Sequence, residues 1–228
     1  MASACETPQE VKRVIRSKKD AMATYNRLSG VYDLLASGAE WKFIETGIRE
    51  LAVRDGESVL EIGFGAGRGL LSLAHSVEPH GKVCGVDISK GMIEAARARV
   101  RDAHVEPVIE LIAGDGSALP FVPGLFDAVF MSFVLELFDN PEIPVVLADS
   151  LRVLKKGGRM CVVALSTKGK RGPALRLYEW AHDNFPNYAD CRPICVGGFL
   201  RVAGFEVVRS EVGSMWGLPV EVVLARKP

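Results

Sequence analysis

The residues best suited to chemistry are three glycines at every second position, Gly63, Gly65 and Gly67, which lie between two acids. They follow a short apolar run that contains Glu61, and a second apolar run ends at Asp87 about twenty residues later. In this pattern the glycines form a tight turn that lets the backbone approach a bound nucleoside, and the later carboxylate accepts hydrogen bonds from ribose hydroxyls. The spacing therefore predicts a site for a nucleoside-containing cofactor.

The glycine spacing separates this turn from two other nucleotide-binding turns. The dinucleotide fingerprint Gly-x-Gly-x-x-Gly requires a third glycine, but that position holds Arg68 when counting starts at Gly63 and Leu70 when it starts at Gly65. The chain also lacks the Gly-Lys-Ser or Gly-Lys-Thr loop that holds phosphates. The turn therefore counts against a nicotinamide-dependent oxidoreductase and excludes a P-loop enzyme.

Strands that alternate with helices must position these residues. The expected strands are Ser58–Ile62, Lys82–Asp87, Pro107–Ile112, Phe126–Phe133, Arg159–Leu165, Phe205–Glu211 and Pro219–Ala225. The expected helices among them are Gly67–Ser76, a helix that Ser89 caps and that runs to about Asp102, Pro144–Leu154, Leu175–Asn184 and Val196–Val202. The alternation predicts an α/β fold with a Rossmann-like, doubly wound, mostly parallel seven-stranded sheet. The last two strands should be antiparallel, because a connection of about seven residues is too short for a parallel crossover.

The first part of the chain has a different pattern. Residues 8–28 are amphipathic and helical in pattern, and two further helical pieces cover 31–36 and 40–53. We expect residues 1–54 to form an N-terminal helical cap on a ligand-binding domain that spans 55–228. Within that domain, a substrate-side insert is expected near 166–195.

Several linked blocks give the glycine turn a family context. They are 61–67, 85–89 together with Met92, 114–121, 126–129 and 152–158, and they occur in this order. Together they resemble the class I S-adenosylmethionine-dependent methyltransferases. Within that class they are similar to the ubiquinone/menaquinone biosynthesis methyltransferases, which share the Leu-Pro-Phe block at 119–121 and an N-terminal Tyr-Asp, here Tyr32-Asp33. The resemblance implies a methyltransferase with S-adenosyl-L-methionine as its cofactor.

The resemblance also assigns cofactor-binding roles. The residues concerned are Tyr25, Tyr32, Glu61, Gly63, Gly65, Gly67, Asp87, Ile88, Met92, Asp115, Gly116, Ser117, Ser132 and Phe133. The glycines would pass close to the methionine part, Glu61 would orient the loop or hold the amino group through a water, and Asp87 would accept both ribose hydroxyls. Ile88 and Met92 would enclose the adenine, with Asp115 accepting its amino group near the amides of 116 and 117. Ser132 and Phe133 would lie at the ligand crevice. The two tyrosines would cover the cofactor.

Simpler interpretations stay open for some of these residues. Asp87 is alternatively a helix cap, Asp115 a turn residue, Met92 a core residue and Tyr32 a packing residue.

The candidates for catalysis are Glu136, whose apolar neighbours would raise its pKa, and His182, since a base would help to methylate a phenolic or quinol carbon. Each of the two is alternatively a surface residue.

An aromatic stretch in the expected insert is the candidate for substrate binding. Its residues are Tyr178, Trp180, Tyr188 and Arg192. The aromatic side chains would form a wall for a planar or lipidic acceptor, or only pack the insert onto the sheet. Arg192 would pair with an acidic substrate or with Asp190. The stretch departs from the quinone enzymes, which puts the quinone acceptor in doubt. N-methylation of a phospholipid head group and methylation of a small thiol or metalloid therefore stay open, as does a non-catalytic binding module.

The amino-acid composition limits which binding partners are expected. The chain has 228 residues, and its 28 Lys and Arg balance 28 Asp and Glu, so the net charge gives no reason to expect nucleic acid. Positive charges are concentrated in residues 12–19, which is typical of a solvated helix face or of a contact with anionic lipid.

Cys191 and Cys195 lack the spacing of a zinc site, and they are either ordinary thiols or a pair that binds a soft metalloid. No metal is expected. Without a secretory signal or an apolar run of membrane length, a cytoplasmic protein is expected, and its oligomeric state stays open.

Overall fold

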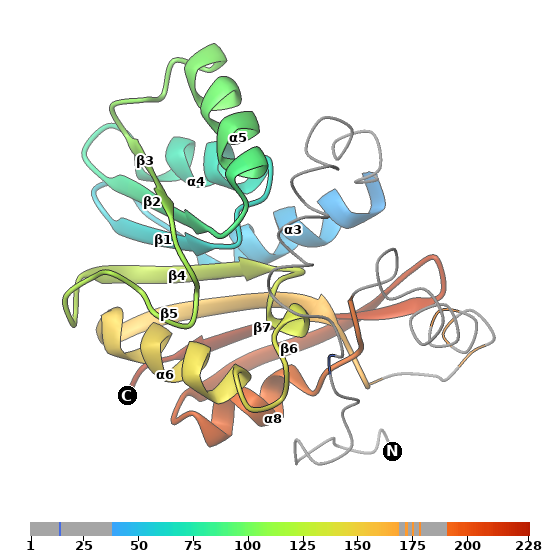
Figure 1. The fold of residues 1–228 in the computed structure, drawn as a ribbon. Coiled ribbons are helices and arrows are strands. Elements are labelled where there is room, and N and C mark those ends of the chain that lie inside the picture. Colours follow the sequence, from blue (N-terminus) through green and yellow to red (C-terminus); the bar gives the residue numbers. More distant parts are fainter. Residues whose placement is uncertain (1–13, 15–37, 169–171, 173–174, 176–177, 179–190) are drawn as a thin grey trace.

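The computed structural model describes residues 14, 38–168, 172, 175, 178 and 191–228. Within these residues, seven strands form one sheet in the order β3-β2-β1-β4-β5-β7-β6 (Figure 1). The strands are β1 Ser58–Ile62, β2 Lys82–Asp87, β3 Ile109–Ala113, β4 Phe126–Ser132, β5 Leu154–Leu165, β6 Glu206–Met215 and β7 Leu218–Arg226. β1 to β5 pair in parallel, whereas β7 pairs antiparallel with both β5 and β6. The predicted fold class is confirmed, including its antiparallel end.

Helices cover both faces of the sheet. They are α3 Gly38–Leu51, α4 Arg68–Val77, α5 Lys90–Asp102, α6 Ile143–Val153 and α8 Val196–Val202, with a short 3-10 helix, η2, at Leu135–Leu137. α3, α4 and α5 contribute to the apolar cluster on one face, and α6 and α8 contribute to the cluster on the other (Figure 1). This arrangement buries the inner strands on both sides.

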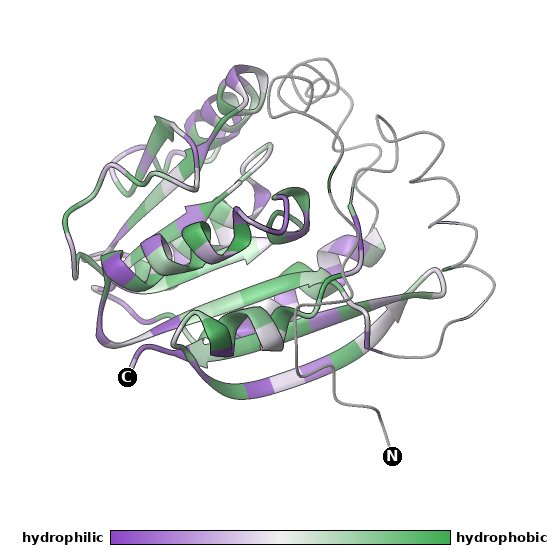
Figure 2. Ribbon diagram, turned by 60° about the horizontal axis from the view of Figure 1, so that its bottom comes forward, coloured by the Kyte–Doolittle hydropathy of each residue, from purple (hydrophilic) through white to green (hydrophobic). Residues whose placement is uncertain are grey.

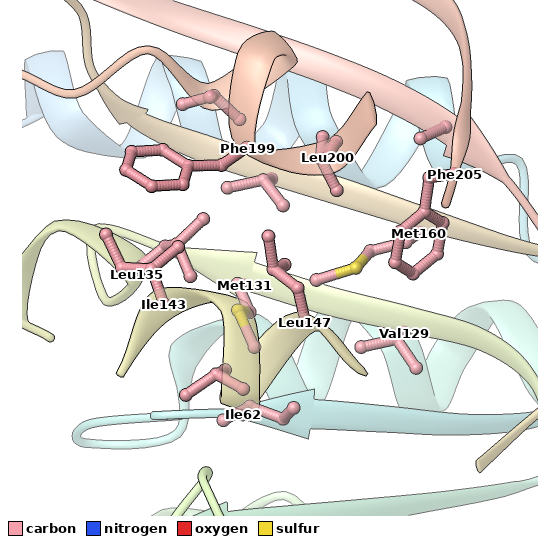
Figure 3. Packing of buried hydrophobic residues seen from close by; sticks show 14 of the residues in the cluster. Ile62, Val129, Met131, Leu135, Ile143, Leu147, Met160, Phe199, Leu200 and Phe205 are labelled. Carbon is pink, nitrogen blue, oxygen red and sulfur yellow. The ribbon is translucent and has the colours of Figure 1, made fainter. Parts of the chain in front are cut away.

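Strand β4 is buried on both faces of the sheet, which explains why its sequence is apolar throughout. Val129 and Met131 face α6 and α8, while Ala128 and Phe130 face the α3 side, and all four are fully buried. Alternate residues of a strand point to opposite faces, so a strand with two covered faces carries no polar alternation. Figure 2 shows hydrophobic residues along the inner strands, and Figure 3 shows the α6 and α8 side of the core in detail.

The last hairpin differs from its prediction. The expected connection of about seven residues is wrong, because β6 continues to Met215 and β7 already begins at Leu218. Only Trp216 and Gly217 remain in the turn, with φ of 50° and 83°. Paired positive φ values are typical of the tight turns that match the twist of a two-stranded hairpin. Cross-strand pairing therefore extends each strand beyond the apolar run that marked it in the sequence.

The N-terminal region is described mainly through α3. This helix packs on the sheet so closely that a side chain at Gly47 would lie 2.6 Å from Val163 and 2.9 Å from Phe130. Its residues join the same apolar cluster as β4 and β5. The division of the chain at residue 54 stays a prediction. In the part of the chain described, no helix combines the length and the hydropathy needed to cross a membrane.

Candidate functional site

The glycine turn lies between β1 and α4, at the carboxyl edge of the sheet. Gly63, Gly65 and Gly67 have φ of 69°, 53° and 85°, a left-handed conformation that glycine adopts without steric cost. The amide of Gly63 donates to the carbonyl of Val86 at 2.7 Å, which holds the turn against β2. The predicted turn is therefore present, and it brings the ends of β1 and β2 together.

Two of these glycines are also required because neighbouring side chains lie too close for a Cβ atom to fit. A Cβ at Gly63 would lie 2.6 Å from Cγ1 of Val134, which follows β4, and a Cβ at Gly67 would lie 2.8 Å from Cβ of Ala96 in α5. Real Cβ atoms do not come this close, since the interior of a protein is packed at crystal density. The turn is thus fitted between the loop after β4 and helix α5.

Asp87 joins the second strand to this turn. Its Oδ2 accepts a hydrogen bond from the amide of Gly65 at 2.9 Å, and its Oδ1 accepts one from the amide of Ser89 at 2.8 Å. Burial raises the pKa of this carboxyl to about 6, against the opposing effect of the backbone hydrogen bonds. The cap of α5 is Ser89, whose hydroxyl accepts from the amide of Met92 at 3.2 Å. Asp87 is therefore a strand-end acceptor rather than a helix cap.

Glu61 is a second buried acid beside Asp87. It is 2% exposed, and burial together with the charge of Asp87 raises its pKa to about 8. Its Oε2 has no hydrogen-bond partner among the described residues. The first turn of α4 lies directly on this carboxyl, so a side chain at Gly69 would overlap its Oε1. An acid with such unmet hydrogen-bonding capacity is suited to a polar or cationic ligand group.

The segment after β3 brings the third predicted acid to the same edge. The amide of Gly114 donates to the carbonyl of Asp87 at 3.0 Å, which places Asp115 beside β2. Oδ1 of Asp115 accepts from the amide and the hydroxyl of Ser117 at 2.9 and 2.8 Å, so Asp115 does form a turn. A side chain at Gly116 would lie 2.7 Å from Ile62 in β1.

The two residues predicted to enclose the adenine differ in exposure. Ile88 is 38% exposed at the end of β2, where it is accessible to a ligand. Met92 is 1% exposed and lies in the core. The structure thus favours the alternative interpretation of Met92 as a core residue in this conformation.

The end of β4 lies beside the glycine turn. β4 ends at Ser132, and Phe133 then adopts a left-handed φ of 54° while its amide donates to the carbonyl of Val163 at 2.7 Å. Glu136 follows in η2, and it is fully buried, with its Oε1 accepting from the amide of Leu165 at 3.2 Å. The surface interpretation of Glu136 is therefore wrong, because its carboxylate bridges β4 and β5 instead of facing solvent.

The segment that returns from the expected insert packs against the same edge. Ile194 donates to the carbonyl of Leu165 at 3.0 Å and accepts from Thr167 at 3.1 Å, which extends the pairing beyond the end of β5. Arg192 is 2% exposed and donates to the carbonyl of Phe138 at 2.6 Å. Its guanidinium therefore contacts the loop after β4. The hydroxyl of Tyr178 donates to the carbonyl of Cys191 at 3.0 Å.

Several predicted site residues lie outside the described residues. They are Tyr25, Tyr32, Trp180, His182 and Tyr188.

A buried polar cluster where β5 ends and β7 begins was not predicted from the sequence. Glu221 is fully buried and accepts from Nζ of Lys168 at 2.6 Å, from the hydroxyl of Ser210 at 2.6 Å and from that of Ser166 at 3.0 Å. The acid inside the apolar run Pro219–Ala225 was the signal that could have pointed to it, because a buried charge requires partners. The cluster anchors the chain where it leaves β5.

Comparisons with known proteins agree with this geometry. Residues 59–158 match a methyltransferase domain family. A demethylmenaquinone methyltransferase of Symbiobacterium thermophilum is 34% identical over 161 residues, which cover 69% of this chain and 62% of that protein. A ubiquinone/menaquinone biosynthesis C-methyltransferase of Pseudomonas fluorescens is 32% identical over 175 residues, covering 76% of this chain and 66% of that one. The match thus spans less than two thirds of the length of either relative.

Solved structures show the same fold. The [4+2]-cyclase SpnF superimposes with a TM-score of 0.78 at 17% identity, covering 96% of this chain and 98% of that one. An S-adenosylmethionine-dependent methyltransferase from Aquifex aeolicus superimposes with a TM-score of 0.66 at 22% identity, covering 88% and 98%. At these identities the likeness concerns the fold, which is Rossmann-like.

Proposed function

Residues 59–158 belong to the methyltransferase domain family, and from this premise we propose that the protein transfers the methyl group of S-adenosylmethionine to a small-molecule acceptor. The family and the fold imply S-adenosylmethionine as the cofactor. The observation that carries the proposal is the Asp87 carboxylate, which is buried at the end of β2 and bonded to the amide of Gly65 in the glycine turn.

The donor would bind across the ends of β1, β2 and β3. A carboxylate has about four acceptor sites, so each oxygen of Asp87 keeps capacity for one ribose hydroxyl besides its backbone amide. The methionine part would follow the glycine turn, where the buried carboxyl of Glu61 would face its ammonium group. A positive charge beside this carboxyl would lower the pKa that burial raises, so donor binding would favour ionised Glu61. The adenine would lie between Ile88 and the turn at Asp115.

Methyl transfer makes few demands on acids and bases. The sulfonium of the donor is already a strong electrophile, so the protein has mainly to align the acceptor with the S–CH3 bond and to exclude water. Ligands bind at the carboxyl ends of the strands in sheets of this kind, and the end of β4 and the glycine turn meet at that edge. Glu136 would act as a positioning residue there, since its carboxylate already bonds to Leu165.

We propose a quinol-type ring as the acceptor. Relatives that methylate demethylmenaquinone or act in ubiquinone and menaquinone biosynthesis, by their names, support this choice. The test supplies S-adenosylmethionine with a labelled methyl group to the protein and 2-geranyl-1,4-naphthoquinol, and mass spectrometry locates the label on the product. Phosphatidylethanolamine and a small thiol serve as competing acceptors. We expect the label on a ring carbon, and label only on a head-group nitrogen or a thiol sulfur would overturn the quinol proposal.

Donor binding should depend on pH because Asp87 must be ionised to accept two hydroxyls. With a pKa of about 6 in the free protein, the carboxyl gains a proton as the pH falls below that value. We expect the affinity for 5′-methylthioadenosine, which keeps the ribose but has no amino acid, to be about tenfold lower at pH 5 than at pH 7. Calorimetry across this range measures it. The Glu61→Gln variant is the control and should keep this step, whereas a flat profile in the wild type would contradict the role of Asp87.

A further inference from the structure

The first residue of α4 is a cation at the end of the helix that favours an anion. Arg68 follows Gly67 directly and begins α4. The amides at the start of a helix carry a partial positive charge, so an acid is favourable in the first turn and a cation is unfavourable. The first turn of α4 contains no acid, and Gly67, its N-cap, has no side chain to cap it. The start of α4 therefore presents backbone amides together with a guanidinium, and both attract an anion.

An aromatic residue of α3 holds the Arg68 side chain. The guanidinium carbon Cζ lies 4.2 Å from the centre of the Trp41 ring, which is a cation–π contact. The indole N–H of Trp41 donates to Oε1 of Glu45 at 2.6 Å, one turn further along α3, and this bond orients the ring. A stacked guanidinium keeps its N–H donors at its edge, and among the described residues no hydrogen bond or ion pair uses those of Arg68. The side chain is thus oriented while its donors stay available.

Arg68 and Trp41 lie at the edge of the sheet where the donor would bind. α4 begins directly after the glycine turn, and the Cα–Cβ bond of a helical residue tilts towards the helix N-terminus, so the Arg68 side chain starts out towards that edge. α3 ends at the opposite edge, because the carbonyl of Leu51 accepts from Arg159, the residue at which pairing of β5 with β7 begins. Trp41 lies ten residues before Leu51, which is roughly 15 Å along the helix axis.

The opposite charge lies beside the same helix start. Glu61 is buried under the first turn of α4, where a Cβ at Gly69 would lie 3.1 Å from Oε2 of its carboxyl. This oxygen has no hydrogen-bond partner among the described residues. A buried acid with unmet hydrogen-bonding capacity and a guanidinium with available donors therefore flank one helix start. The arrangement is complementary to a ligand group that carries both charges.

We propose that Arg68 binds the carboxylate of the methionine part of S-adenosylmethionine. The inference rests on the proposed function, in which Glu61 faces the ammonium of the same amino acid. Ammonium and carboxylate are attached to one carbon atom, so a ligand with its ammonium at Glu61 brings its carboxylate to the start of α4. A guanidinium binds a carboxylate through two parallel hydrogen bonds, and the amides of the first turn add further donors. Trp41 is then a positioning residue, since it acts through Arg68.

Decarboxylated S-adenosylmethionine isolates this contact, because it lacks only the carboxylate. Calorimetry compares its dissociation constant with that of S-adenosylmethionine for the wild type and for Arg68→Gln. In the variant we expect the affinity for S-adenosylmethionine to fall about tenfold, the scale of a hydrogen-bonded charge pair open to water. The affinity for the decarboxylated ligand should not fall. Arg68→Lys keeps the charge but not the two parallel hydrogen bonds, and it should lie between wild type and Arg68→Gln.

The positioning role of Trp41 has its own test with the same two ligands. Trp41→Leu removes the aromatic face and should weaken S-adenosylmethionine binding about threefold, the scale of an exposed cation–π contact. Binding of the decarboxylated ligand should again be unaffected, and Trp41→Phe should restore most of the loss. A Trp41→Leu variant that binds S-adenosylmethionine as tightly as the wild type overturns this role.

A matched control separates the contact from a general effect of charge. Arg101→Gln removes an exposed arginine from the last turn of α5 and should change neither affinity. If Arg68→Gln weakens both ligands equally or leaves both unchanged, the carboxylate contact is wrong, while tight binding of S-adenosylmethionine by the wild type leaves the proposed function standing. If the wild type binds no S-adenosylmethionine, the proposed function fails, and the contact fails with it.

Discussion

Replacing Asp87 by alanine should weaken S-adenosylmethionine binding by about 100-fold. The variant loses two hydrogen bonds from ribose hydroxyls to a charged acceptor, each of which contributes about 1.5–3 kcal/mol, and a combined loss of about 3 kcal/mol corresponds to about two factors of ten. It also frees the amide of Gly65 from its 2.9 Å hydrogen bond, so the glycine turn is less well held before the donor arrives. Titration calorimetry measures the dissociation constant directly.

Two variants bracket this result. Asp87→Asn keeps one carbonyl oxygen and should fall between wild type and alanine, since an uncharged acceptor makes weaker hydrogen bonds. Glu110→Ala removes an exposed acid from the neighbouring strand β3 and should leave the affinity unchanged. An Asp87→Ala protein that binds the donor as tightly as the wild type would refute the ribose assignment.

The Gly63→Ala variant should lose about 3 kcal/mol of folding free energy, which corresponds to a melting temperature lower by about 6–12 °C. The new methyl group meets Val134, whose Cγ1 would lie 2.6 Å away, and alanine must also adopt a φ of 69°. Both terms act on the turn that faces the donor, so S-adenosylmethionine affinity should fall together with stability. Thermal unfolding, with and without the donor, measures both effects.

The chain offers a matched control for the free-energy cost of placing alanine at a positive φ. Gly124 has the same φ of 69°, but a Cβ at this position would meet no atom of the described residues within 4 Å. Gly124→Ala therefore isolates the conformational cost, which is about 1–2 kcal/mol. Gly63→Ala should be less stable than Gly124→Ala, and adding Val134→Ala to Gly63→Ala should recover most of that difference in folding free energy. If the double variant is no more stable than Gly63→Ala alone, the contact with Val134 is not the cause.

Much of the donor half could be predicted from local sequence signals. β1 and β2 have the predicted bounds, and Ser89 caps α5 as expected. Short apolar runs that end in glycine or acid specify these elements through local interactions. The start of β4 and both ends of helix α8 followed from the same kind of pattern, and β4 ends one residue before its predicted end.

The remaining features depend on contacts between distant segments. The length of the last hairpin follows from cross-strand pairing, which continued past Gly213 and Ser214 although both residues disfavour strands. The burial of Arg192 depends on Phe138, more than fifty residues earlier. The enclosure of the Glu61 carboxyl depends on how α4 covers β1. No pattern of nearby residues encodes such contacts.

The residues proposed to bind the donor and the segments after β5 occupy separate parts of the chain, which has a consequence for engineering the protein. The residues proposed to bind the donor lie between Glu61 and Ser117 on one half of the sheet, whereas Arg192 and the β6–β7 hairpin belong to segments that follow β5. A hairpin turn of two residues can mutate without disturbing the ladder behind it. Substitutions in the segments after β5 should therefore leave the proposed donor half unchanged, which makes these segments a practical starting point for a library that varies the acceptor.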